Sequence, residues 1–344
     1  ANPGRIMRYL MFCHIFSHRM YALASWLNAR ANAEVMIVSS APWQCSELRG
    51  VRRVHFRASS RRETAGGIMG QWEDAVQKGK QALSTLETVR ATGFVPDIIL
   101  NSSVSGAGLC LRQAFPEAFL VHYIERVPNA ADAKFRDILH AVQTRMADIS
   151  FAWEGFPGIL RAPLAVDTDY FRPAGVRRGK NIIFGFVSQP LVSLLKNLAG
   201  AEDLSGVTIL LPGRNVRKKL EEEGVVPENV NLEVNPTFER LREIFSAASV
   251  YVRPAKGSGI PVELLLAMSA GVAVMTDCAN PFFRPGVNCL RIRRGQSVLK
   301  SLEDPNLEKI GASARRDVMR NFGLEAALPA HFEKIMASRE QKSR

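Results

Sequence analysis

The stretch Arg253-Pro-Ala-Lys-Gly-Ser-Gly-Ile-Pro-Val-Glu-Leu-Leu-Leu-Ala-Met-Ser-Ala-Gly271 is the most informative part of the sequence. It runs from the end of a predicted strand through a glycine-rich turn into a predicted helix. Gly257 and Gly259 allow the backbone to approach a ligand closely, and Pro261 suits the first helical position. Because unpaired amides at a helix N-terminus attract phosphate, the stretch predicts an anion site. A plain strand-to-helix connection is the alternative.

On both sides of this stretch, short β-rich apolar runs alternate with segments of helical periodicity. In the first half, the predicted strands are 6–14, 34–39, 96–100, 118–124 and 149–153, and the predicted helices are 18–31, 72–92, 106–114 and 130–146. A second series of predicted strands comprises 181–187, 208–211, 230–234, 250–253, 273–276 and 289–291. This rhythm predicts an α/β fold with parallel sheets and crossover helices. Between the strands and helices, the glycine-rich residues 64–70 predict a mobile loop.

The length of 344 residues favours two domains, because a single hydrophobic core stops growing below this size. Residues 161–175 contain several helix and strand breakers and have poor periodicity, which suits an interdomain linker.

The composition is that of a folded protein with a strongly basic surface. Apolar residues make up 47%, and no run approaches the roughly 20 apolar residues of a membrane-spanning helix. The net charge of +12 attracts polyanions, which by charge alone include nucleic acid, an anionic membrane surface and phosphorylated substrates. Since no RNA-binding or zinc-finger signature accompanies the basic clusters, we expect no nucleic-acid partner.

The five cysteines, Cys13, Cys45, Cys110, Cys278 and Cys289, form no CxxC pair. Reduced thiols are therefore expected rather than zinc ligands or disulfides. With no signal peptide visible, the expected location is the cytoplasm.

Four segments in series carry a family resemblance. They are Val166-Asp-Thr-Asp-Tyr-Phe-Arg-Pro173, Lys256-Gly-Ser-Gly-Ile-Pro261, Leu266-Ala-Met-Ser-Ala-Gly271 and Gly286-Val-Asn-Cys-Leu290. Their order and spacing resemble the retaining GT-B glycosyltransferases of the family 4 (glycosyl transferases group 1) type. The resemblance covers residues 163–173 and 250–291, and the N-terminal half matches only in its rhythm.

The resemblance implies a GT-B fold, in which two Rossmann-like domains have parallel sheets facing a central cleft. Residues 1–162 are then an acceptor-side domain, 163–180 a linker, and 181–315 a domain that binds a nucleotide sugar. Residues 316–344 are expected to form C-terminal helices and a charged tail.

The resemblance places the donor site around the glycine-rich turn. The predicted donor-binding residues of the turn are Gly257, Ser258, Gly259 and Ile260. Where the family usually has two glutamates, this chain has Lys256 and Leu266. Lys256 is predicted to act in catalysis by stabilising the leaving nucleotide. Glu263, one helical turn before Leu266, is predicted to bind the donor ribose in place of the missing carboxylate, with a solvated charge as the alternative.

Two further cations, Lys196 and Arg214, are candidates for binding the donor, because the family tends to place Arg and Lys after the first strand of the second domain. Arg214 follows a predicted strand, at the carboxyl end of the sheet where open α/β folds bind ligands. A surface charge without a ligand is the alternative for both.

On the acceptor side, His122 and Glu125 follow a predicted strand and are the predicted catalytic residues. His14 and His18 follow the first strand, where family members often have a glycine-rich loop. They are candidates for binding acceptor or sugar hydroxyls, and a structural role is the alternative.

The predicted function is transfer of a sugar from a UDP- or GDP-linked donor to a glycan, lipid-linked or similar acceptor, with retained configuration. No cofactor besides the donor and no metal is predicted, since Asp167-Thr-Asp169 lies in the linker rather than at a strand end. The expected protein is a monomer or weak dimer, cytoplasmic and peripheral to the inner face of an anionic membrane.

Two alternatives stay open at this point. One is a sugar-nucleotide epimerase or a sugar phosphorylase with the same architecture. The other is a catalytically degenerate GT-B protein that binds glycans or protein partners, which the missing glutamates make plausible.

Overall fold

The computed structural model describes residues 5–41, 48–58, 67–102, 106–125, 133–153, 156, 158–175, 181–185, 206–211, 218, 222, 230–255, 257–293 and 298–343. The chain divides into two compact units. Unit 1 comprises Ala1–Ala165 and Ala327–Arg344, and unit 2 comprises Val166–Ala326. Each unit is described by itself below.

Unit 1 contains a seven-stranded parallel sheet in the order β3-β2-β1-β4-β5-β6-β7. The strands are β1 (Met7–Cys13), β2 (Ala33–Ser39), β3 (Arg52–His55), β4 (Ile98–Ser102), β5 (Phe119–Ile124), β6 (Ile149–Ala152) and β7 (Leu160–Arg161). The strand order reverses between β1 and β4. The crevice outside the carboxyl ends of these two strands is therefore the topological switch point, where open α/β sheets bind ligands.

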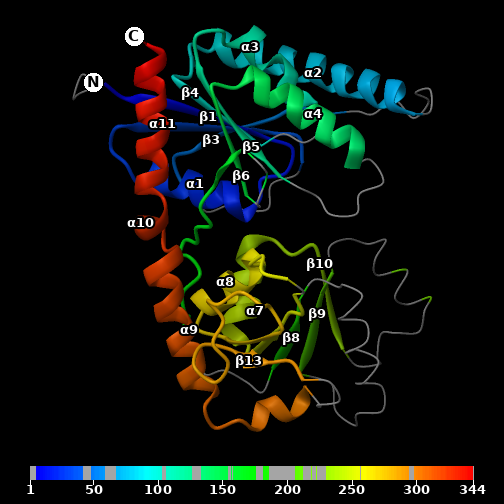
Figure 1. Cartoon of the computed structure of the whole chain (residues 1–344), viewed down its shortest axis with the longest axis vertical. Coiled ribbons are helices and arrows are strands. Elements are labelled where there is room, and N and C mark those ends of the chain that lie inside the picture. The colour runs from blue at the N-terminus through cyan, green and yellow to red at the C-terminus, as the bar shows by residue number, and fades with distance from the viewer. Residues whose placement is uncertain are drawn as a thin grey trace. The chain divides into compact units, whose positions relative to one another are not determined.

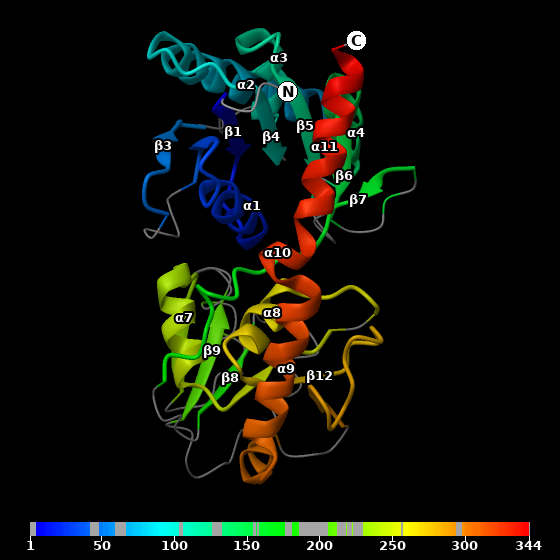
Figure 2. The same cartoon turned by 90° about the vertical axis from the view of Figure 1, so that its left-hand side faces the viewer.

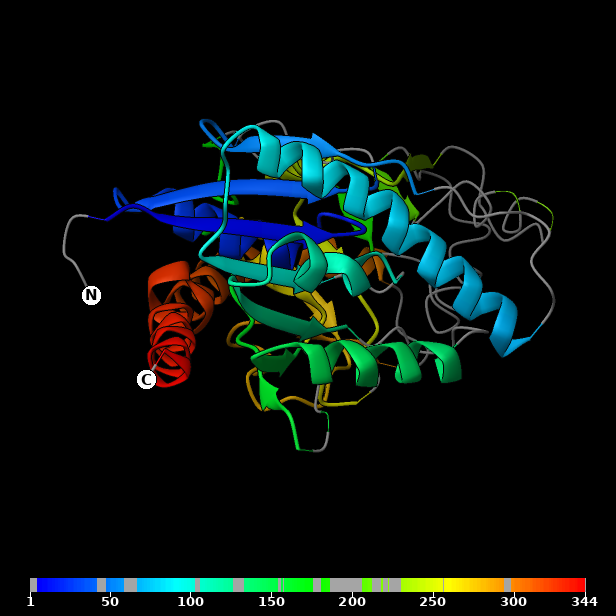
Figure 3. The same ribbon diagram turned by 90° about the horizontal axis from the view of Figure 1, so that it is seen from above.

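Helices cover both faces of this sheet (Figures 1 and 3). They are α1 (His18–Asn28), α2 (Ile68–Ala91), the 3-10 helix η1 (Ala107–Cys110), α3 (Leu111–Ala114), α4 (Ala133–Met146) and α11 (Pro329–Lys342). Leu10 and Phe12 of β1 pack against Leu86 and other residues of α2. Tyr9 points to the opposite face, because side chains alternate along a strand. Strands covered on both faces are nearly continuous apolar runs, as β1 and β5 are.

The C-terminal helix α11 belongs to unit 1, although unit 2 precedes it in the sequence. Figure 2 shows α11 in red alongside β5 and β6. The Phe332 ring stacks on Trp26 with centroids 4.7 Å apart, and it meets Tyr9 edge-on at 6.3 Å. Of the residues 316–344 that the sequence analysis grouped as one tail, those after Ala327 thus complete the core of unit 1.

Unit 2 contains a six-stranded parallel sheet in the order β10-β9-β8-β11-β12-β13. The strands are β8 (Ile182–Phe184), β9 (Val207–Leu211), β10 (Asn231–Val234), β11 (Val250–Val252), β12 (Ala273–Thr276) and β13 (Leu290–Arg291). The helices are α7 (Phe238–Ala247), α8 (Val262–Ser269), the 3-10 helix η2 (Leu299–Glu303), α9 (Leu307–Phe322) and α10 (Leu324–Ala327). The strand order reverses between β8 and β11, which places the switch point of unit 2 between them.

The segment that resembles the family linker packs against α8 and α9 within unit 2. The buried Phe171 accepts a hydrogen bond at its carbonyl from Ser269 Oγ, 2.8 Å away. Arg315 of α9 donates to the carbonyls of Thr168 (3.1 Å) and Ser269. Val166 N donates to Phe322 O at 2.8 Å. Two of the four resembling segments, distant in sequence, are therefore in direct contact.

The predicted α/β class with two parallel sheets is confirmed. Strands β3 and β7 are absent from the prediction, because the Arg52–His55 strand carries two arginines and β7 has only two residues. The predicted loop over 64–70 is wrong from Ile68 onward, where α2 begins after Gly67 at φ 90°. The predicted helix over 106–114 is a 3-10 turn followed by one α-helical turn.

Candidate functional site

The glycine-rich turn of unit 2 lies between β11 and α8, beside the segment that follows β12. Ala279 N donates to Gly257 O at 2.9 Å, and Asn280 Nδ2 donates to Ser258 O at 2.8 Å. The Cys278 thiol lies 3.4 Å from Gly259 O. The segment 278–280 thus binds successive carbonyl oxygens of the turn.

The amides of the same turn have no acceptor in the described part of the chain, from Gly257 to Ile260. Gly257 adopts φ 96°, which favours glycine. The sequence analysis placed Pro261 at the first helical position, and the structure places it at the N-cap of α8, where no side chain caps the helix. Uncapped amides and the positive end of the helix dipole form an anion-binding edge.

Glu263 is half-buried in the first turn of α8. Burial first, and the negative charge of Glu263 second, raise the pKa of the Tyr251 hydroxyl of β11 well above its usual range. Lys256, Lys196 and Arg214 lie outside the described residues, so their predicted roles stay predictions.

Three residues at the switch point of unit 2 are missing from the sequence predictions. Gly185 directly follows β8, and its amide donates to Val252 O at 2.8 Å. A Cβ atom on Gly185 would lie 2.5 Å from the hydroxyl oxygen of Tyr251 and 2.7 Å from Cδ of Arg253. Both side chains therefore lie against the bare backbone of Gly185. The available signal was Arg253 itself, a cation directly after an apolar strand and before the glycine-rich turn.

Two of the resembling segments take part in packing against α9. Asn288 is fully buried, and its amide donates to Phe282 O (2.9 Å) and to Asp317 of α9 (2.8 Å). Gly271 ends α8 at φ 73°, and a Cβ atom on Gly311 of α9 would lie 2.2 Å from its carbonyl oxygen. The segments 266–271 and 286–290 thus place α9 close to α8.

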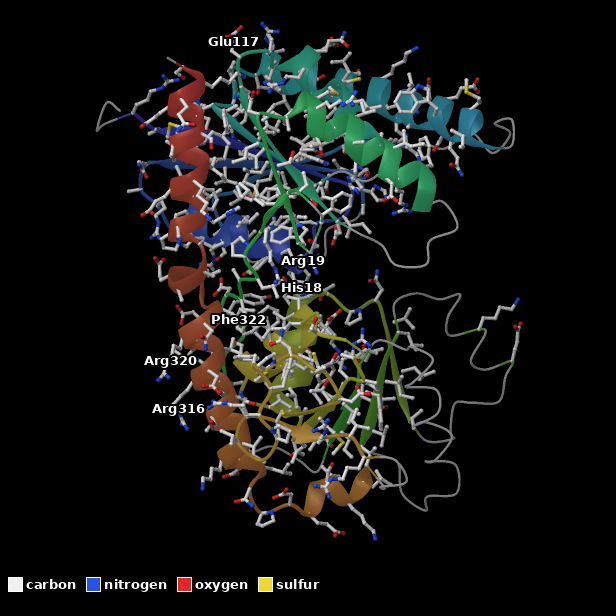
Figure 4. The ribbon with its side chains drawn as sticks, in the orientation of Figure 1. His18, Arg19, Glu117, Arg316, Arg320 and Phe322 are labelled. Atoms are coloured by element: carbon white, nitrogen blue, oxygen red, sulfur yellow. The ribbon has the colours of Figure 1, made fainter. Side chains whose placement is uncertain are left out.

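In unit 1, Glu125 lies just beyond β5. Its carboxylate forms an ion pair with Arg19 Nη1 at 3.5 Å, and the Arg19 guanidinium lies 5.5 Å from the ring centroid of Trp153. His18 and Arg19 begin α1, at the end of unit 1 that Figure 4 shows opposite to Glu117. Arg19 is a further residue that sequence reasoning missed, because its partners come from β5 and β6.

The two histidines after β1 have different surroundings. His14 Nδ1 forms a hydrogen bond with the Ser40 hydroxyl, and burial lowers its pKa, with the positive charges of Lys78 and Arg136 adding to the effect. For His18, burial lowers the pKa to about 3. Both are therefore neutral at pH 7, and their roles in binding hydroxyls stay predictions.

His122 is fully buried and belongs to a hydrogen-bonded series inside unit 1. Asn101 Nδ2 lies 3.2 Å from His122 Nδ1, and His122 Nε2 lies 3.2 Å from His140 Nδ1. His140 Nε2 lies 3.3 Å from the carbonyl oxygen of Glu125. Burial lowers the pKa of His122 to about 3, so this ring is neutral.

The series supports the backbone of Glu125 and occupies both ring nitrogens of His122. The catalytic role of His122 on an acceptor stays a prediction. Glu125, by contrast, keeps 31% of its side chain exposed.

A pocket of about 550 Å³ lies at the other edge of unit 1, where β1 and β4 begin. Its charged lining includes Asp97, whose carboxylate pairs with Arg5 at 2.7 Å and with Arg339 at 3.5 Å. Arg8 of the same lining pairs with Glu34 at 2.9 Å. These charges largely satisfy one another, and the pocket is not at the carboxyl edge of the sheet.

The sequence of unit 1 matches a known family. Residues 31–150 match the glycosyl transferase family 4 group. Comparison with curated protein sequences gives no significant match.

Solved structures share the fold of the chain. Sucrose-phosphate synthase from Thermosynechococcus elongatus has a TM-score of 0.66 at 14% identity, covering 96% of this chain and 100% of that chain. The catalytic domain of starch synthase IV from Arabidopsis thaliana, bound to ADP and acarbose, has a TM-score of 0.62 at 10% identity, with 98% and 100% covered. HepE from Anabaena, in complex with UDP, has a TM-score of 0.56 at 11% identity, with 96% and 100% covered.

The structural matches show the fold, which is GT-B. The sequence match to the glycosyl transferase family 4 group is confined to residues 31–150. This range contains His122 and Glu125, whereas the four segments that suggested the family all lie outside it, in unit 2.

Three further observations concern the part of the chain that the structure describes. Among the described helices, none has the length and apolar character that a membrane span requires. Within the same ranges, no group of three or more His, Cys, Asp or Glu side chains is placed to bind a metal ion. Cys13, Cys110, Cys278 and Cys289 are free thiols, and Cys45 lies outside the described residues.

Proposed function

We propose that this chain is a glycosyltransferase that takes its sugar from a UDP- or GDP-linked donor and binds the donor diphosphate at the turn Gly257–Ile260. The observation that carries the proposal is the different hydrogen bonding of the carbonyl oxygens and the amides of this turn. Its carbonyl oxygens accept bonds from the segment 278–280, whereas its amides lack an acceptor in the described part of the chain, beside the uncapped start of α8. Two of the solved structures with this fold contain UDP and ADP.

The proposed reaction breaks the bond between the anomeric carbon of the sugar and the terminal phosphate oxygen. The anomeric carbon forms a bond to an acceptor hydroxyl oxygen, whose proton is released. Negative charge develops on the departing diphosphate, and preorganised amides stabilise such charge. Lys256, which directly precedes Gly257, adds a positive charge, and Arg214 and Lys196 are proposed as further cations for the donor. Retention of configuration is proposed from the family resemblance.

Glu263 is proposed to accept hydrogen bonds from the donor ribose. Its carboxylate is half-buried on the first turn of α8, two residues after the N-cap Pro261. The ribose of a nucleoside diphosphate is joined directly to its diphosphate, and Glu263 follows the turn closely in the sequence. A carboxylate can accept hydrogen bonds from the two neighbouring hydroxyl groups of a ribose.

For the acceptor side, we propose Glu125 as the group that takes the proton of the acceptor hydroxyl. Its partly exposed carboxylate and its ion pair with Arg19 support this role, since the pair orients the carboxylate. A glycan or lipid-linked acceptor, a cytoplasmic location and contact with an anionic membrane surface are proposed from the net charge of +12 and from the resemblance.

The donor proposal is tested at Gly259, where a Cβ atom would meet nothing within 4 Å. The variant Gly259→Asp places a negative charge at the proposed diphosphate site, and Gly259→Asn adds the same bulk without the charge. Calorimetric titration with UDP, GDP and ADP should show affinity lowered roughly tenfold or more by Asp and only about two- to threefold by Asn. Equal affinities for both variants and the wild type would place the diphosphate elsewhere.

Turnover separates the enzyme from the alternative of a degenerate GT-B binding protein. Release of nucleoside diphosphate from UDP- and GDP-sugars, measured with and without candidate glycan acceptors, should exceed that of the Glu125→Gln variant. Unchanged rates in a chelator are expected for metal-independent transfer. Binding of nucleotide without any release would favour the degenerate protein.

A further inference from the structure

Two buried polar groups at the switch point of unit 2 have no hydrogen-bond partner among the described residues. They are the Tyr251 hydroxyl and Arg253 Nε. Tyr251 is 0% exposed. Because a buried polar group without a partner is costly, native structures rarely retain one unless a ligand, ion or water satisfies it.

The positions of these groups favour a ligand. Tyr251 Oη and Arg253 Cδ lie so close to the backbone of Gly185 that a methyl group there would overlap both, at 2.5 Å and 2.7 Å. Gly185 follows β8 and pairs with Val252 of β11, so all three residues border the crevice between β8 and β11. Such crevices bind ligands in open α/β sheets.

The chemistry of the two groups specifies the ligand. An arginine Nε–H only donates, and a tyrosine hydroxyl readily donates to an anionic oxygen. Arg253 also lies four residues before Gly257, on the same chain segment that leads into the turn with unpaired amides. Donors from the side chains and the backbone therefore converge on the same end of the sheet.

We propose that Tyr251 and Arg253 bind phosphate oxygens of the donor diphosphate, together with the turn 257–260. This assignment rests on the proposed donor function and adds two residues to it. Gly185 has a positioning role, because only a residue without Cβ lets both side chains reach the crevice. Glu263, whose charge acts on Tyr251, then borders the same site on the side of α8.

The proposal predicts opposite effects of one substitution on stability and on binding. Tyr251→Phe removes an unsatisfied hydroxyl, so the melting temperature of the ligand-free protein should stay equal or rise. Its affinity for the best-binding nucleoside diphosphate should fall roughly tenfold, because hydrogen bonds to charged groups are among the stronger ones. A buried hydroxyl with a purely structural role would produce the reverse, namely a lower melting temperature and unchanged affinity.

Arginine variants complete the experiment. Arg253→Gln should weaken binding more than Arg253→Lys, which retains the charge. Arg284→Gln is the matched control, since Arg284 is an exposed arginine of unit 2 paired with Asp317 at 2.7 Å. Titrations use UDP, GDP, ADP and inorganic pyrophosphate. The fold-loss should be similar for pyrophosphate and for the nucleotides, because the proposed contact is to the diphosphate.

The outcomes distinguish this inference from the donor proposal. If Gly259→Asp weakens nucleotide binding while Tyr251→Phe and Arg253→Gln do not, the donor site stands and this inference falls. A loss confined to nucleotides, with pyrophosphate binding unchanged, would overturn the assignment to the diphosphate. Absence of any nucleotide binding by the wild-type protein would overturn both proposals.

Discussion

At the scale of single residues, one carbonyl group determines which ring nitrogens carry the protons in the hydrogen-bonded series of His122 and His140. The Glu125 carbonyl can only accept, so His140 Nε2 donates to it. A neutral imidazole carries one N–H, hence His140 Nδ1 accepts from His122 Nε2. His122 Nδ1 then accepts from the amide of Asn101. Burial lowers the pKa of both histidines, which keeps them neutral and preserves these directions.

We expect Asn101→Leu to destabilise unit 1 by about 1–3 kcal/mol, because it removes the donor that this series offers to His122 Nδ1 while keeping the same number of side-chain heavy atoms. Asn101 is 1% exposed. The matched control Asn28→Leu affects an exposed asparagine bonded to Arg49 O, and it should change stability by less than about 0.5 kcal/mol. Urea unfolding measures both. Equal effects of the two variants on stability would contradict the hydrogen bond from Asn101 to His122.

At the scale of elements, α11 shows how a terminal helix becomes part of a distant core. Phe332 stacks on Trp26 of α1, and the fully buried Ile335 follows one turn later. The Tyr123 hydroxyl of β5 is hydrogen-bonded to His331 Nε2 at 2.7 Å. Helix α11 therefore lies beside α1 on the same face of the sheet, over β5 and β6.

We expect Phe332→Ala to destabilise unit 1 by about 3–5 kcal/mol, the usual cost of truncating a buried aromatic side chain. The control Glu333→Ala, exposed on the same helix, should change stability by less than about 0.5 kcal/mol. All four tryptophans, Trp26, Trp43, Trp72 and Trp153, belong to unit 1, so tryptophan fluorescence in urea reports on this unit alone. An unchanged fluorescence midpoint in Phe332→Ala would show that α11 is dispensable.

At the scale of the whole molecule, the titratable imidazoles are distributed unevenly. All six histidines belong to unit 1, and the sequence of unit 2 contains none. Burial lowers the pKa to about 3 for His18 and His122 and to about 4 for His331. The two units should therefore respond differently to mild acid.

Between about pH 6.5 and pH 5, the unfolded state of unit 1 binds protons that these folded histidines do not. Stability is thus complete above the unfolded pKa near 6.5 and falls as the pH decreases toward the folded values. We expect a loss of about 1–2 kcal/mol for each of the three histidines over this range, measured by tryptophan fluorescence. His331→Gln should reduce the pH dependence. A stability of unit 1 that is constant from pH 7 to pH 5 would contradict these pKa shifts.

The order of most strands and helices and the glycine-rich turn before α8 were readable from the sequence alone. Apolar periodicity, glycine and proline act locally, so β1, β5, α8 and the turn at Gly257 followed from neighbouring residues. The arginine-rich β3 escaped this reasoning, because an edge strand is stabilised by its partner rather than by its own apolar pattern.

The sequence by itself determined the α/β class, the two series of parallel strands and the glycine-rich turn before α8, since these depend on residues close together in the chain. The tertiary structure decided that α11 completes unit 1, that His122 is buried between Asn101 and His140, and that Tyr251 and Arg253 lie against Gly185. Burial and hydrogen-bond pairing join residues that are distant in sequence, and only folding brings such residues into contact.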